Sequence, residues 1–168
     1  REPKAGIRLY RNKAGLEFGD VTRKTAIESI GERDAAFADF DGDGAVDLVQ
    51  LAPDFLRVSL NREGVFGQVL EKSVDEGAAL AVGDADGDGD IDLYVLQGRD
   101  RGGSHDVMML NDGDGRSFTR LDVPEVKGGS EDDVIALDYD MDGRTDFLAL
   151  NGRNSERGPV QLITLRPA

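Results

Sequence analysis

A nine-residue run with aspartates at positions 1, 3, 5 and 9 and glycine at position 6 occurs three times in this chain of 168 residues. The copies span 39–47, 84–92 and 138–146, so they begin 45 and then 54 residues apart. Four carboxylates confined to nine residues repel one another unless a cation lies among them, and a flexible cage of oxygen ligands suits Ca²⁺ better than Mg²⁺. Each run is therefore predicted to be a calcium loop.

The glycine at position 6 is expected to allow a sharp backbone turn, so that the main-chain carbonyl at position 7 can face the ion. Up to three calcium ions are predicted, and their ligand residues are Asp39, Asp41, Asp43, Ala45, Asp47, Asp84, Asp86, Asp88, Asp90, Asp92, Asp138, Asp140, Asp142, Arg144 and Asp146.

An EF-hand or dockerin loop is the nearest alternative, but it requires a bidentate glutamate at position 12. Those positions hold Gln50, Val95 and Ala149, which lie within strand-like patterns. The third loop departs most from the repeat, because Met141 replaces a glycine and Thr145 replaces an apolar residue. The expected order of occupancy is therefore the second loop, then the first, then the third.

The net charge of -14 belongs mainly to these loops, which hold thirteen of the 24 aspartates. Outside them acidic and basic residues nearly balance, so the acidity does not predict a basic partner. No cationic stripe is present to meet nucleic-acid phosphates, and no run of about eighteen apolar residues is present to span a membrane. Cysteine is absent, which excludes disulfides and thiol nucleophiles.

A second repeated element alternates with the aspartate loops. Asn12, Asn61 and Asn111 recur 49 and then 50 residues apart, each followed by glycine and then by Phe18, Phe66 or Phe118. Asparagine and glycine between apolar flanks predict tight hairpins, in which each phenylalanine anchors the returning strand. A period near 50 with several short strands in each unit is typical of propeller blades.

The predicted fold is all-β: a partial β-propeller of about three four-stranded blades, with a calcium loop between strands A and B of each blade. The whole chain, 1–168, is interpreted as one propeller segment. Its expected parts are the end of a preceding blade at 7–30, blades with calcium loops at 34–78 and 79–131, and a third blade at 132–168 that lacks its last strand. Because propellers need about four to eight blades to close, the rest of the ring is expected from the parent chain or from oligomerisation.

The sequence resembles the FG-GAP or VCBS repeat family. Residues 83–93 match its Gly-Asp-x-Asp-Gly-Asp-Gly-x-x-Asp-Leu motif, and Phe18-Gly19 and Phe66-Gly67 match its Phe-Gly half, whereas Leu51-Ala-Pro53 is a remnant of its Gly-Ala-Pro half. Residues 9–22 also resemble the cartilage-acidic-protein-like branch. The resemblance implies a β-propeller, seven-bladed in integrin α heads, with calcium in the A–B loops.

Two other patterns resemble functional sites. The run 111–115, with Asp112 and Asp114, could form a weaker fourth metal site, but it lacks a later carboxylate and is better explained as a hairpin turn. Ser104-His105-Asp106 contains the residue types of a catalytic triad, yet triads are assembled from distant segments. Because no nucleophile–base pair is evident, the protein is not expected to be an enzyme.

The expected function is therefore a calcium-stabilised scaffold for protein–protein interaction or adhesion. Arg99, Arg101, Arg153 and Arg157, in two long B–C loops, form a hypothesised surface for an acidic protein or glycan. Loops of this kind need calcium at about 10⁻⁴ to 10⁻³ M, which favours a secreted, extracellular, periplasmic or cell-envelope location. The alternatives are a polysaccharide-binding or polysaccharide-lyase-associated propeller, and an architectural subunit of a larger surface or envelope assembly.

Overall fold

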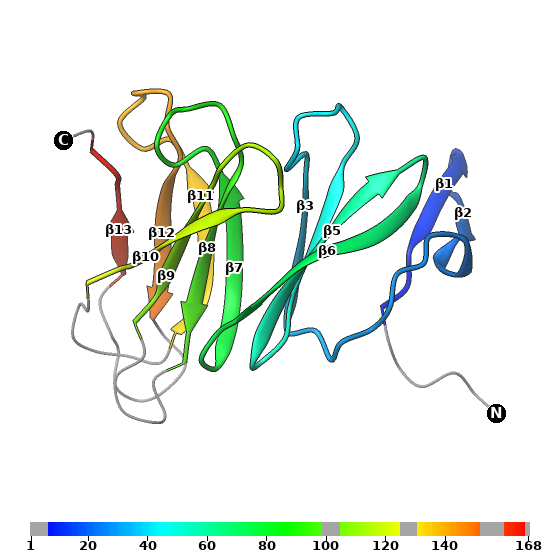
Figure 1. The fold of residues 1–168 in the computed structure, drawn as a ribbon, viewed down its shortest axis with the longest axis horizontal. Coiled ribbons are helices and arrows are strands. Elements are labelled where there is room, and N and C mark those ends of the chain that lie inside the picture. Colours follow the sequence, from blue (N-terminus) through cyan, green and yellow to red (C-terminus); the bar gives the residue numbers. More distant parts are fainter. Residues whose placement is uncertain (1–6, 99–104, 125–130, 152–159, 167–168) are drawn as a thin grey trace.

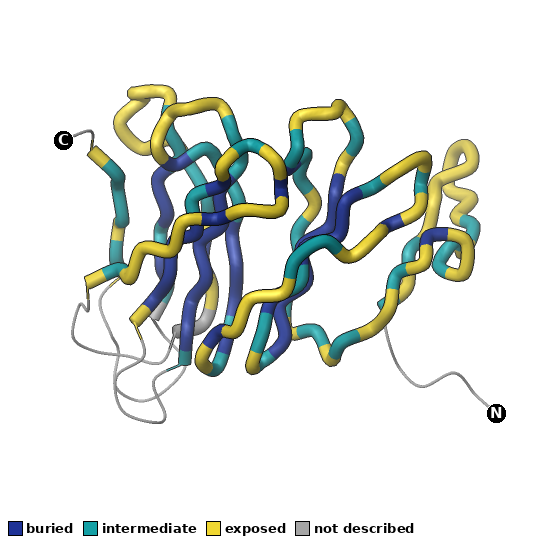
Figure 2. The backbone as a smooth tube through the Cα atoms, viewed as in Figure 1, coloured by how far each residue is buried: buried dark blue, intermediate teal, exposed yellow. Residues whose placement is uncertain are grey.

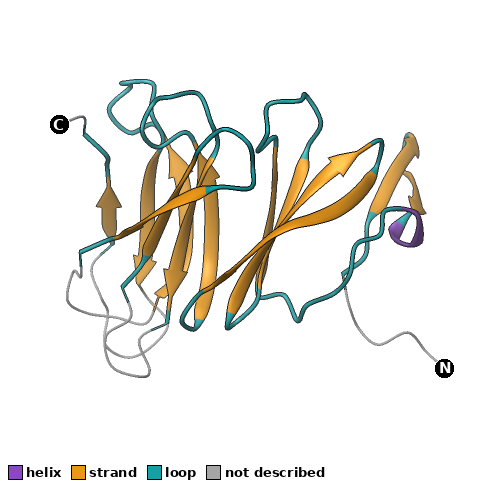
Figure 3. Cartoon of the chain, in the orientation of Figure 1, coloured by secondary structure: helices purple, strands orange, loops and turns teal. Residues whose placement is uncertain are grey.

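The computed structural model describes residues 7–98, 105–124, 131–151 and 160–166. These residues form thirteen β-strands and one short 3₁₀ helix, η1 (Thr22–Lys24) (Figures 1 and 3). The strands are β1 (Tyr10–Ala14), β2 (Glu17–Asp20), β3 (Asp34–Ala38), β4 (Asp47–Leu51), β5 (Phe55–Arg62), β6 (Val65–Ser73), β7 (Gly77–Gly83), β8 (Asp92–Gln97), β9 (Val107–Asn111), β10 (Phe118–Asp122), β11 (Glu131–Leu137), β12 (Asp146–Asn151) and β13 (Gln161–Ile163).

The strands form four antiparallel sheets, each of which follows the order of the chain. The orders are β1-β2, β3-β4-β5-β6, β7-β8-β9-β10 and β11-β12-β13. The all-β prediction is therefore confirmed, and the strands expected on either side of each aspartate loop are found there. A propeller arrangement of these sheets stays a prediction. No helix in the described ranges is long and apolar enough to cross a lipid bilayer.

The strand that follows each of the first two aspartate loops is buried along its whole length, as Figure 2 shows for β4 and β8. Alternate side chains of β8 enter two different hydrophobic clusters. Leu93 and Val95 join the cluster shared with the β3–β6 sheet, whereas Tyr94 and Leu96 join the one shared with the β11–β13 sheet. Because successive side chains of a strand point to opposite faces, a strand covered on both sides is apolar at consecutive positions.

The first strands of the three larger sheets lie beside one another, since β7 packs against both β3 and β11. The backbone N–H of Leu80 on β7 donates to Asp34 Oδ2 on β3 at 2.9 Å. On the other side, the rings of Tyr94 and Phe147 are stacked with centroids 5.1 Å apart, and both side chains are fully buried. Small residues in these strands, such as Ala36 on β3 and Ala81 on β7, allow this close approach.

The three aspartate loops lie along one edge of the row of sheets, together with the β5–β6 and β9–β10 hairpin turns (Figure 1). This is the arrangement expected for antiparallel meanders, in which successive turns alternate between the two edges. The loop surface hypothesised from Arg99, Arg101, Arg153 and Arg157 lies outside the described residues.

The hairpin phenylalanines do not all behave as predicted. Phe66 and Phe118 are buried and anchor β6 and β10, which confirms the prediction for the second and third hairpins. The prediction was wrong for Phe18, which is 60% exposed. Its hairpin, β1-β2, is a two-stranded sheet within the described residues, so no third strand of that sheet lies beside the hairpin to pack against the phenylalanine.

Candidate metal sites

Each aspartate loop connects the first and second strands of its sheet and gathers three carboxylates. The oxygens of each group lie within 4.8 Å of one another, which is close enough for one cation to touch all three. The groups are Asp39, Asp41 and Asp43; Asp84, Asp86 and Asp92; and Asp138, Asp140 and Asp146.

The aspartate at position 1 and the glycine at position 6 fold each loop in the same way. Gly44, Gly89 and Gly143 each donate their backbone N–H to the Oδ2 of that aspartate, at 2.8, 3.1 and 3.1 Å. Their φ angles are 87°, 95° and 89°, a region that favours glycine because it has no Cβ. The predicted sharp turn at position 6 is confirmed in all three loops.

The aspartate at position 9 has a structural role that the sequence did not reveal. Asp92 is fully buried, and its two oxygens accept backbone N–H groups from Ala85 in the loop and from Asn111 at the end of β9, both at 2.8 Å. Asp47 accepts from Phe40 and Asn61 in the same way, at 2.9 and 2.7 Å. This carboxylate therefore joins the start of the loop to the third strand.

The recurring asparagine was the signal that could have identified this contact. The asparagine pattern predicts only a turn, yet Asn111 also connects two sheets, because its Nδ2 donates to Phe40 O in the first loop at 2.7 Å. A second connection joins the other two loops, where the backbone N–H of Thr145 donates to Asp84 O at 2.6 Å. Neighbouring aspartate loops are thus hydrogen-bonded to each other, directly or through one hairpin.

The carboxylates raise one another's affinity for protons. Burial raises the pKa of Asp92 to about 6, with the charges of Asp86 and Asp88 adding to the rise, although two backbone hydrogen bonds act to lower it. Burial also raises the pKa of Asp47, and the charges of Asp41 and Asp39 contribute. A divalent cation would relieve this repulsion, since an adjacent positive charge favours the ionised carboxylate.

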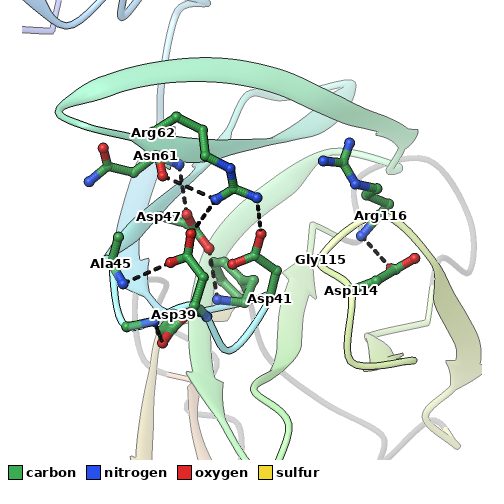
Figure 4. A network of polar contacts seen from close by, with 12 residues as sticks. Asp39, Asp41, Ala45, Asp47, Asn61, Arg62, Asp114, Gly115 and Arg116 are labelled. Atoms are coloured by element: carbon green, nitrogen blue, oxygen red, sulfur yellow. Dashed lines mark hydrogen bonds and ion pairs between the residues drawn. The ribbon is translucent and has the colours of Figure 1, made fainter.

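One atom in the first loop lacks the partner that burial normally demands. Asp41 Oδ1 is buried and has no hydrogen-bond donor, although the other oxygen of Asp41 pairs with Arg62 (Figure 4). A buried carboxylate oxygen without a partner is costly. The donor set of hard oxygens and this unsatisfied atom both fit a calcium ion.

The remaining predicted ligands lie outside the three groups. In the second loop, Asp88 Oδ1 accepts the N–H of Asp90 at 2.9 Å, and Asp142 Oδ1 accepts the N–H of Arg144 at the same distance in the third. Asp43, which does belong to the first group, makes the same kind of contact, because its Oδ1 accepts the N–H of Ala45 at 2.8 Å. These aspartates stabilise their own turns, and their role as ligands stays a prediction.

The third loop keeps the backbone of the other two despite its different sequence. Met141 at position 4 has a φ of 62°, close to the 67° and 84° of Gly42 and Gly87. For a residue with a Cβ this conformation costs about 1 to 2 kcal/mol. The side chain of Met141 is 90% exposed, so nothing packs on it to offset that cost.

The two alternative patterns have structural explanations. The run 111–115 is the β9–β10 turn, in which Asp114 Oδ1 accepts the backbone N–H groups of Arg116 and Ser117, both at 2.8 Å. His105 is exposed, whereas Asp106 is buried and accepts a hydrogen bond from Tyr94 Oη at 3.0 Å. Asp106 therefore holds the base of its loop, and Ser104 lies outside the described residues.

No protein-family model matches the chain, and no curated protein matches it.

Proposed function

We propose that the three aspartate loops bind calcium ions and that these ions stabilise the chain. The observation that carries the proposal is the repeated convergence of three carboxylates at one edge of the sheets. Asp84, Asp86 and Asp92 would hold the ion of the second loop, and the corresponding groups would hold the other two. The ion would supply positive charge that offsets carboxylate repulsion and ties the first strand of each sheet to the second.

We further propose that the chain is a segment of a β-propeller of the FG-GAP or VCBS kind. Three features support this. Each larger sheet is an antiparallel meander, the first strands of neighbouring sheets lie together as at the inner end of blades, and the loops share one edge. The remaining blades would come from the parent chain or from further copies.

The role that suits such a segment is a non-enzymatic scaffold for a protein partner. Most of the aspartates lie in the three loops, where they form the turns and the proposed metal sites. Asp106 is buried and accepts a hydrogen bond from Tyr94, so it too has a structural role. Sites that need calcium near about 10⁻⁴ to 10⁻³ M would be filled outside cells, so a secreted or cell-envelope location is proposed.

The proposal is tested by calorimetric titration with calcium and by thermal unfolding in calcium, magnesium or chelator. We expect calcium to raise the melting temperature more than magnesium, since a site filled at one hundred times its Kd adds about 2.7 kcal/mol. Asp86→Asn should reduce the number of ions bound. The control is Asp122→Asn, which changes the same charge on an exposed side chain of β10. Equal melting temperatures in calcium and chelator would refute the proposal.

A further inference from the structure

The first aspartate loop differs from the second in having a basic side chain among its carboxylates. Arg62, at the end of β5, directs its guanidinium into the loop (Figure 4). Nη1 lies 2.6 Å from Asp43 Oδ2, and Nη2 pairs with Asp41 Oδ2. One arginine therefore neutralises two of the three carboxylates that converge in this loop.

The arginine occupies oxygens that an ion would need. The second oxygen of Asp43 already accepts the N–H of Ala45 at 2.8 Å, and both oxygens of Asp39 accept backbone N–H groups, from Asp43 at 3.2 Å and from Gly44 at 2.8 Å. Asp41 Oδ1 is left as the one buried side-chain oxygen of this loop without a partner. Arg62 thus satisfies the loop only in part, and a calcium ion would satisfy it better.

The second loop is built differently at the same point. The residue after the hairpin asparagine is Arg62 in the first unit but Asp112 in the second, and the run 84–92 contains no basic residue. In the third loop Arg144 belongs to the run itself, with its Nε 3.5 Å from Asp142 Oδ2. The second loop has five carboxylates, and among the described residues none of them forms an ion pair with a basic side chain, although the side chain of Arg144 lies against Gly87.

We propose that Arg62 is a resident counter-ion that a calcium ion must displace, so that the first loop is a weaker calcium site than the second. This inference rests on the proposed function and adds a determinant of affinity to it. Displacement is feasible because the side chain of Arg62 is 52% exposed and can turn into solvent. Calcium would then release a guanidinium at the loop edge as well as order the loop.

The three position-6 glycines allow each loop to be followed separately. The amides of Gly44, Gly89 and Gly143 bond to the first aspartate of their own loops, so their nitrogen–proton NMR signals report local ion binding. In a calcium titration of the unaltered protein, we expect Gly89 to reach its midpoint at a lower calcium concentration than Gly44.

Arg62→Gln should lower the Gly44 midpoint roughly tenfold and leave that of Gly89 nearly unchanged. Tenfold is about 1.4 kcal/mol, the order of magnitude for breaking two partly exposed ion pairs. Arg62→Lys keeps the charge but loses the forked geometry, so its midpoint should lie between the two. Arg120→Gln is the control for net charge, because Arg120 pairs with Asp122 on β10; it should shift Gly44 less than twofold.

The outcomes separate the two proposals. If Gly89 responds to calcium but Arg62→Gln leaves the Gly44 midpoint in place, or if Gly44 responds before Gly89 in the unaltered protein, the counter-ion role of Arg62 is refuted. If none of the three glycines responds, calcium binding itself is refuted, and the role of Arg62 is refuted with it.

Discussion

Gly83 offers a direct test of how the second and third sheets pack. A Cβ added at Gly83 would lie 2.7 Å from Cβ of Thr145 and would approach its Cγ2 more closely still. Thr145 cannot easily move away, because its side chain is β-branched and its backbone N–H is bonded to Asp84 O at 2.6 Å. Gly83→Ala should therefore strain the contact between the second and third loops.

The expected loss is about 1 to 3 kcal/mol, the usual cost of inserting one methyl group into a packed site. Thr145→Gly removes the obstructing atoms. The double variant with Gly83→Ala and Thr145→Gly should therefore have a free energy of unfolding at least about 1 kcal/mol higher than the sum of the two single changes predicts. Gly67→Ala is the matched control, because no atom lies within 4 Å of the added Cβ. It should be neutral or stabilising by up to about 1 kcal/mol.

Guanidinium unfolding in chelator isolates this packing effect from ion binding. Far-UV circular dichroism is the suitable signal, since the chain has no tryptophan. If Gly83→Ala unfolds at the same denaturant concentration as Gly67→Ala, or if Thr145→Gly restores nothing, the deduced contact between the two loops is wrong.

Three further predictions concern the loops. Asp88→Ala should abolish most of the calcium-dependent rise in melting temperature that the second loop provides, whereas an unchanged rise would show that Asp88 is not a ligand. The pKa of Asp92 is raised to about 6 in the ion-free protein, so below this pH the carboxylate is mostly protonated and a proton must leave before calcium binds. The Kd for calcium should therefore rise as pH falls from 7 to 5. The released protons can be counted by calorimetry in two buffers. A Kd that is flat over this range would contradict the burial of Asp92. Asn111→Ala should lower the free energy of unfolding by about 1 to 3 kcal/mol, because the side chain bonds to Phe40 O and to the N–H groups of two glycines. Chemical denaturation measures this loss, and an unchanged free energy would contradict the role of these hydrogen bonds.

The strands could be predicted from the sequence because their patterns are local. The strand-like patterns around Gln50, Val95 and Ala149 correspond to β4, β8 and β12, and the recurring asparagine and glycine residues predicted the hairpins. The left-handed glycine at position 6 followed from the demands of a tight loop. These features depend on residues within about ten positions of one another.

The parts that could not be predicted join residues that are distant in the sequence. The contact of Asn111 with Phe40 spans 71 residues, and no local pattern indicates which carbonyl a side-chain amide will find. The pairing of Arg62 with Asp41 and Asp43 likewise depends on how the β5–β6 hairpin lies over the loop. The exposure of Phe18 depends on which strands lie beside its hairpin.

The division of β8 between two hydrophobic clusters has a consequence for the dynamics of the chain. Leu93 and Val95 face one neighbouring sheet while Tyr94 and Leu96 face the other, so exposing the amides of β8 requires both interfaces to open. Hydrogen–deuterium exchange should therefore be slowest in β8 and faster in the outer hairpin β1-β2, whose residues are largely exposed. The middle sheet would then be the last part of the chain to lose its protection when the protein is destabilised.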